Sequence, residues 1–194
     1  MPWTRGGNIT DLTFDPSAPL IIQDSLAKAP RKFRVEDGVS GTINDIQETL
    51  HACLHVGRLD RAATTMRRLN KIYKPDAPEL VAMHNEYIAS LVERIVRTKD
   101  QELLRQVQTW FEVDMCARGI APNPTTIALM IQAALQESKQ AKIDRTIRRY
   151  IALADQAGFL DEAMTVALST LNEQEIGRVT RVCLSSLRVS WTVY

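Results

Sequence analysis

Apolar residues recur at intervals of three and four from residue 42 onward, the spacing that places them on one face of an α-helix. The first two stripes flank Gly57, whose missing Cβ suits the left-handed turn that ends a helix. They consist of Ile43, Ile46, Leu50, Cys53 and Leu54 before it and Leu59, Ala62, Ala63, Met66, Leu69 and Ile72 after it. No segment shows convincing strand alternation, so the pattern predicts an all-α fold of antiparallel helix pairs.

Capping signals predict where the later helices begin and end. Gly119 and Gly158 have the character of helix stops. The predicted N-caps are Asp76 and Asn172, each with Glu three residues on, together with Asp100 and Asn123, the latter followed by Pro124. We therefore expect a third helix from about 76 through 95, and then helices at 100–119, 123–135, 140–157, 161–171 and from 172 onward.

The chain divides into three parts on this pattern. Residues 1–41 hold half of the prolines and glycines and no sustained period, which predicts an extended or disordered lead-in. Residues 42–182 form the helical-repeat domain, and residues 183–194 a tail. The interval from Pro75 to Pro122 differs from that between Gly119 and Gly158, whereas tetratricopeptide arrays keep about 34 residues. We expect a degenerate pentatricopeptide- or tetratricopeptide-like superhelix.

Positive charge gathers in two short clusters of an otherwise balanced chain. The net charge is +1, so affinity for nucleic acid has to come from local patches. The first basic cluster is Arg61, Arg67, Arg68, Lys71 and Lys74, and the second is Lys139, Lys142, Arg145, Arg148 and Arg149. We predict contact with DNA or RNA by Arg67, Arg68, Lys71, Lys142, Arg145, Arg148 and Arg149. The alternative for each cluster is a solvated helix face whose cations favour the helix dipole.

Motifs for catalysis or metal binding do not emerge. His51 and His55 share a helix face, but Ala52 stands where a zinc metalloprotease needs Glu. The three cysteines form no CxxC pair, and no phosphate-binding glycine loop occurs. Trp110-Phe111 follows the apolar stripe, which favours the core over a platform for stacking bases. We predict no catalytic residue, metal ligand or cofactor in this chain, and no membrane span, because no apolar run approaches about 18 residues.

Two stretches resemble pentatricopeptide repeats. GRLDRA at 57–62 resembles the turn of such a repeat, and DMCARGIAPNPTT resembles the end of one repeat and the start of the next. The fifth residue of a repeat, usually Ser, Thr or Asn in repeats that read RNA bases, falls here on Glu48, Glu86 and Leu129. The resemblance therefore implies a repeat scaffold without the code for base reading.

Five blocks in order resemble the N-terminal domain of fungal mitochondrial DNA-directed RNA polymerase, the single-subunit, phage-like enzyme. They are GVSGTINDIQETLHACLHVGRLDRAATTMRRL, HNEYI, WFEVDMCARGIAPNPTTIALMIQAAL, IDRTIRRYIALADQAG and LNEQEIGRV. The resemblance implies a noncatalytic domain of the mitochondrial matrix that contacts promoter DNA, nascent RNA or accessory factors. The catalytic residues and the magnesium of that family belong to a downstream polymerase domain, which is absent here.

Both ends of the chain depart from that expectation. The first 27 residues hold one arginine against three aspartates, so no organelle presequence is visible. After Cys183 the sequence LSSLRVSWTVY leaves the family pattern, and we expect this tail to be read-through into an intron of an incomplete gene model. Sequencing of cDNA across Cys183 would test this. The alternative to the polymerase domain is a free-standing pentatricopeptide-like RNA-binding or adaptor protein.

Overall fold

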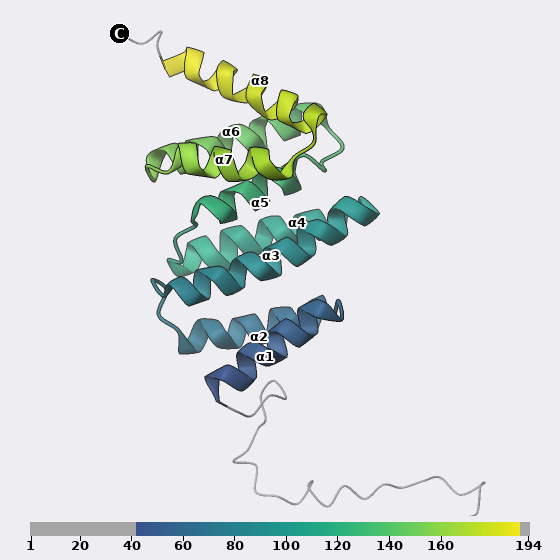
Figure 1. The fold of residues 1–194 in the computed structure, drawn as a ribbon, viewed down its shortest axis with the longest axis vertical. Helices are drawn as coiled ribbons and strands as arrows, with labels where there is room; N and C mark the ends of the chain where they lie inside the picture. Colours follow the sequence, from purple (N-terminus) through teal and green to yellow (C-terminus); the bar gives the residue numbers. More distant parts are fainter. Residues whose placement is uncertain (1–41, 191–194) are drawn as a thin grey trace, which may run out of the picture. The chain divides into compact units, whose positions relative to one another are not determined.

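The computed structural model describes residues 42–190, with side chains through residue 184, and these residues form stacked helices (Figure 1). The predicted lead-in, 1–41, lies outside the described residues. In chain order the elements are α1 (Ile43–His55), α2 (Leu59–Ile72), α3 (Pro78–Thr98), α4 (Gln101–Thr109), the π-helix η4 (Trp110–Met115), the 3-10 turn η5 (Cys116–Arg118), α5 (Pro124–Ala134), α6 (Gln140–Gln156), α7 (Leu160–Thr170) and α8 (Glu173–Ser190). No strand occurs among the described residues, which confirms the all-α prediction.

Consecutive helices pair as hairpins, and the hairpins pack on one another. α1 packs against α2, α3 against α4, and α5 against α6. Between hairpins, α5 lies against both α3 and α7, while α6 lies against α8. Helices α3, α5 and α7 therefore form one row and α6 and α8 part of another, while α2 packs against α3, as in solenoid proteins whose repeats bury a continuous core.

Local signals explain most of the helix ends. Gly57, Gly119 and Gly158 adopt φ of 72°, 78° and 78°, the left-handed conformation that a Cβ disfavours. The Asn123 side chain caps α5, with Pro124 in the first turn. Asn172 and Glu175 exchange capping-box hydrogen bonds of 3.0 and 3.2 Å at the start of α8.

The predicted cap at Asp76 is wrong. α3 begins at Pro78, and its N-cap is Ala77, which has an extended backbone (ψ 121°) and offers no side-chain hydrogen bond. The proline explains the shift, because its ring suits the first helical position and forces the preceding residue out of the helical region.

The predicted helix 100–119 is also more complex than its apolar stripe indicates. Asp100 caps it as expected, accepting the Glu102 N–H at 2.8 Å. After Thr109, however, the backbone widens into the π-helix η4 and then tightens into η5. A π turn holds more residues than an α turn and is found frequently at functional sites. Here η4 buries the carboxylate of Asp114 between hairpins.

The last helix crosses a predicted boundary. α8 continues through Cys183 to Ser190, so residue 182 lies within a helix. Val179 and Val182 of this helix are buried and pack against the rest of the core.

Candidate nucleic-acid interface

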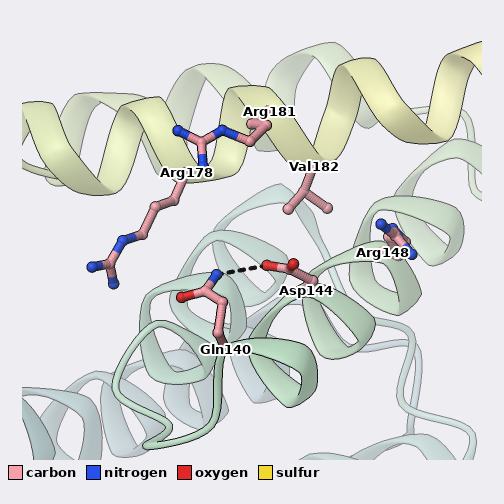
Figure 2. Close-up of a pocket in the computed structure, with 6 residues that line it drawn as sticks. All are labelled: Gln140, Asp144, Arg148, Arg178, Arg181 and Val182. Atoms are coloured by element: carbon pink, nitrogen blue, oxygen red, sulfur yellow. Dashed lines mark hydrogen bonds between the residues drawn. The ribbon is translucent and has the colours of Figure 1, made fainter.

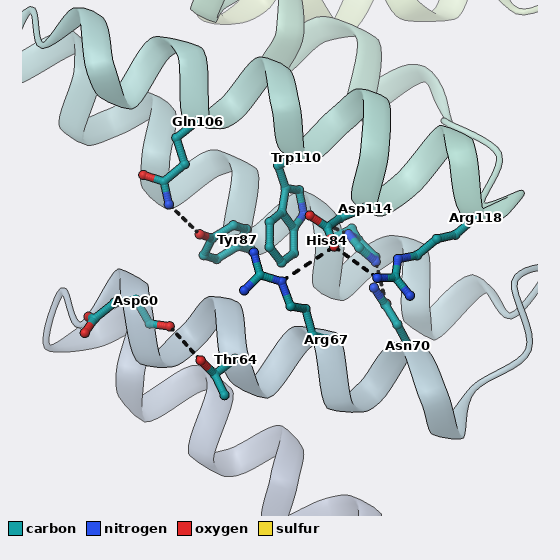
Figure 3. A network of polar contacts seen from close by, with 10 residues as sticks. All are labelled: Asp60, Thr64, Arg67, Asn70, His84, Tyr87, Gln106, Trp110, Asp114 and Arg118. Atoms are coloured by element: carbon teal, nitrogen blue, oxygen red, sulfur yellow. Dashed lines mark hydrogen bonds and ion pairs between the residues drawn. The ribbon is translucent and has the colours of Figure 1, made fainter. Parts of the chain in front are cut away.

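The first basic cluster lies on α2, apart from Lys74, which follows it, and Arg67 contacts the next hairpin. Arg67 Nε lies 3.7 Å from Asp114 Oδ1, and its guanidinium carbon lies 5.5 Å from the centroid of the Trp110 ring (Figure 3). The Asp114 side chain is only 9 % exposed, and Arg118 Nη2 approaches the same oxygen at 3.4 Å. Two half-exposed arginines thus compensate one buried carboxylate, whose charge would otherwise be removed from water without a partner.

A buried histidine completes this joint between α2, α3 and η4. The indole N–H of Trp110 donates to His84 Nδ1 at 3.0 Å, which leaves Nε2 to donate to Asn70 Oδ1 at 2.8 Å. Tyr87 packs against the Trp110 ring with centroids 4.4 Å apart. Burial, with Arg118 nearby, lowers the pKa of His84 to about 4, so the ring is neutral at pH 7.

The other members of the first basic cluster differ in accessibility. Arg68 is half-buried, and its Nη1 atom is enclosed. Lys71 is exposed, as are Arg61 and Lys74, and within residues 42–184 none of these three forms an ion pair. Of the residues predicted to bind nucleic acid in this cluster, Lys71 is the one that is exposed and forms no ion pair within residues 42–184.

The second basic cluster lies on α6, and two of its members are already paired. Lys142 Nζ lies 2.5 Å from Glu137, whose pKa it lowers by hydrogen bonding. Arg149 forms an ion pair with Glu112 of η4, and this hydrogen bond raises the pKa of the arginine. Arg145 is exposed and has no ion pair in the described part of the chain.

The two clusters therefore share a structural role that their sequence does not reveal. Arg67 of α2 and Arg149 of α6 both reach carboxylates of η4, Asp114 and Glu112 respectively. The π-helix thus connects to the even-numbered helices before and after it. These two arginines remain about half exposed, with side-chain accessibilities of 55 % and 56 %.

A groove between α6 and α8 brings Arg148 together with two arginines that the sequence reasoning missed. Its volume is about 480 Å³, and it is lined by Gln140, Asp144, Arg148, Arg178, Arg181 and Val182 (Figure 2). Arg178 and Arg181 lie outside both basic clusters in a segment with more acids than bases, so local charge counting does not select them. The signal in the sequence that could have identified them is their spacing of three, which places both arginines on one face of a helix.

The odd-numbered helices carry the positions that read bases in pentatricopeptide repeats. Glu48 on α1 is exposed, Glu86 on α3 pairs with His51 Nδ1 at 3.1 Å, and Leu129 on α5 packs against the core. A cleft of about 880 Å³ between α1 and α3 is lined by Glu86 and Glu93 among others. Carboxylates at this surface repel phosphate, so it is unsuited to an RNA strand.

Trp110 and Phe111 belong to the core, with exposures of 2 % and 1 %, which confirms the packing interpretation over the stacking platform. His51 and His55 are exposed at the α1–α3 cleft. Among the described residues, no group of three or more His, Cys, Asp or Glu side chains is placed to hold a metal ion. Over the same residues, no helix is both long and apolar enough to cross a membrane.

Comparison with known families accounts for the repeat architecture. Residues 23–192 match the family described as "RPO41-like, TPR repeats". The chain belongs to this RPO41-like family. The match extends over the last helix and past residue 182, the boundary predicted from the sequence.

A curated relative of this RPO41-like chain is the mitochondrial DNA-directed RNA polymerase of Neurospora crassa, which is 27 % identical over 173 residues. The aligned region covers 88 % of this chain and 12 % of the polymerase, so the chain spans a small part of that relative's length. No solved structure matches the chain.

Proposed function

We propose that this chain is the N-terminal repeat domain of a mitochondrial DNA-directed RNA polymerase, acting in transcription in the mitochondrial matrix and noncatalytic by itself. The RPO41-like family and the Neurospora relative support this assignment. The remainder of the polymerase and transcription accessory factors are the protein partners that it implies.

The domain acts by positioning nucleic acid through its phosphates. The observation that carries this proposal is the separation of charge between even-numbered and odd-numbered helices. Lys71, Arg145 and the groove arginines lie on even-numbered helices, whereas the odd-numbered helices hold Glu48 and Glu86 at base-reading positions. The arginines of α3 do not reverse this pattern, because Arg94 donates to Gly57 O and Arg97 pairs with Glu93.

Binding of this kind is independent of base sequence and depends strongly on salt. Each phosphate contact to a single strand releases counterions and contributes a slope of about −0.7 to a plot of log affinity against log salt concentration. Promoter DNA and nascent RNA both present such phosphates. Glu48, which is exposed on α1, remains available for contact with a protein partner.

A salt titration of oligonucleotide binding tests the proposal. We expect the 194-residue chain to bind a single-stranded oligonucleotide at low salt, and Lys71→Gln and Arg145→Gln each to reduce the slope by about 0.7. The matched control is Arg97→Gln with Arg105→Gln, which removes two arginines held in exposed ion pairs with Glu93 and Glu102. A chain that does not bind at low salt, or slopes unchanged in both single variants, would refute nucleic-acid contact.

The Arg149 side chain is deliberately left intact in this test. Its ion pair with Glu112 joins α6 to η4, so its replacement changes packing as well as charge.

The transcript provides a separate test of the polymerase assignment. A reading frame that continues into a polymerase palm and fingers sequence is expected, and its absence would favour the free-standing adaptor.

A further inference from the structure

The groove between α6 and α8 differs from the basic clusters because its charge comes from two helices. α6 contributes Arg148, Asp144 and Gln140, and α8 contributes Arg178 and Arg181. The groove also has an apolar floor, since Val182 is 4 % exposed and lies between the two helices (Figure 2). A concave surface lined mainly by charges of one sign concentrates ligands of the opposite sign.

Its charge balance is positive. Three arginines and one acid, Asp144, line it, and Asp144 Oδ1 already accepts a hydrogen bond from Gln140 Nε2 at 2.8 Å. Glu175, in the first turn of α8, is the acid nearest to Arg178 along the chain. It already accepts hydrogen bonds from the Asn172 backbone N–H and from Gln136 Nε2. Within residues 42–184, Arg178 and Arg181 form no ion pair, and both are exposed.

We propose that this groove binds the phosphodiester backbone of single-stranded nucleic acid, with Arg178 and Arg181 as its phosphate ligands. This inference rests on the proposed function. It adds a binding site for nucleic acid whose phosphate ligands lie outside both basic clusters. Guanidinium groups hold phosphate oxygens by paired hydrogen bonds, which an ammonium group does not match. Residues three apart on a helix are surface neighbours, so the two arginines can serve adjacent points on one strand.

The shape of the groove selects a single strand over a duplex. With a volume of about 480 Å³ the groove has the size of a small-ligand site, which admits a segment of phosphodiester backbone but not a double helix. A flexible single strand can place its backbone in that space and turn its bases outward. RNA and DNA share this backbone, and both are therefore expected to bind.

The test compares Arg178→Gln/Arg181→Gln with the wild-type chain in salt titrations on single-stranded RNA, single-stranded DNA and duplex DNA of equal length. We expect the double variant to lose about 1.4 from the slope on both single strands. The control Arg97→Gln/Arg105→Gln is expected to retain the wild-type slope. Arg178→Lys/Arg181→Lys keeps the charge and is expected to keep the slope, which separates phosphate contact from a defect in folding.

The outcomes distinguish the two proposals. If the wild-type chain binds and Lys71→Gln lowers its slope while Arg178→Gln/Arg181→Gln does not, the groove proposal is overturned and the broader function stands. An equal loss of slope on the duplex would overturn the preference for a single strand. If the wild-type chain binds no oligonucleotide at low salt, the proposed function itself fails.

Discussion

Replacement of His84 should change how the stability of this domain depends on pH. The imidazole is fully buried between Asn70 and Trp110. Burial lowers its pKa from 6.5 to about 4, and the cation of Arg118 acts in the same direction. The unfolded chain therefore takes up a proton at a higher pH than the folded chain, and the free energy of unfolding falls as the pH drops below about 6.5.

The magnitude follows from the shift. Each pKa unit corresponds to about 1.36 kcal/mol, so the lowered pKa of His84 reduces the free energy of unfolding by about 3 kcal/mol once the pH reaches 4. Between about pH 7 and about pH 5.5 the expected loss is roughly 1 kcal/mol. This window lies above the range in which carboxylates ordinarily titrate.

Urea unfolding followed by circular dichroism measures this difference. His84→Gln keeps one hydrogen-bond donor and one acceptor but has no proton to gain, so its stability should fall by about 1 kcal/mol less than the wild type over that window. His55→Gln, at an exposed position on α1, serves as the control. Parallel pH profiles for wild type and His84→Gln would refute a buried neutral histidine at this joint.

Three further predictions concern the connections between hairpins. Asp114→Asn should lower the free energy of unfolding by about 0.5–1.5 kcal/mol in urea titrations, because the charged acceptor of the Arg118 hydrogen bond and of the Arg67 ion pair is lost; a change below the error of the titration would contradict this. A double-mutant cycle on the half-exposed pair of Arg149 and Glu112 should give a coupling of only about 0.2–1 kcal/mol, and a larger value would show that this pair is shielded from solvent. Gly119→Ala should cost about 1–2 kcal/mol in thermal melts, since φ is 78° there, whereas an unchanged melting temperature would argue against the left-handed turn.

The ends of a helix could be predicted from the sequence where a single nearby residue, such as a glycine or an N-cap, determines them. Glycines at 57, 119 and 158 and the caps Asn123 and Asn172 act through their own backbone or the next few residues, so a single sequence shows them. The prediction of an N-cap at Asp76 was wrong because Pro78, two residues later, favours the first helical position and makes Ala77 the N-cap. The apolar stripes predicted most of the core, including Trp110, because burial follows helical periodicity, but Ile43 and Ile72 at the ends of their helices are exposed.

The roles of the basic residues could not be read from the sequence, because they depend on partners far along the chain. Arg67 meets Asp114 across 47 residues, and Arg149 meets Glu112 across 37. Composition counts both arginines as free surface charge, whereas each carries an ion pair between hairpins. The converse holds for Arg178 and Arg181, whose segment has no excess of positive charge until α6 is placed beside it.

The central claim is that this domain binds the nucleic-acid backbone without reading bases, and competition between oligonucleotides tests it most directly. Single-stranded RNAs of equal length but different sequence should compete for the chain with affinities that agree within about tenfold, because a single specific base contact is worth about 1–3 kcal/mol and none is expected. A preference for one sequence well beyond tenfold, at constant salt, would contradict the account.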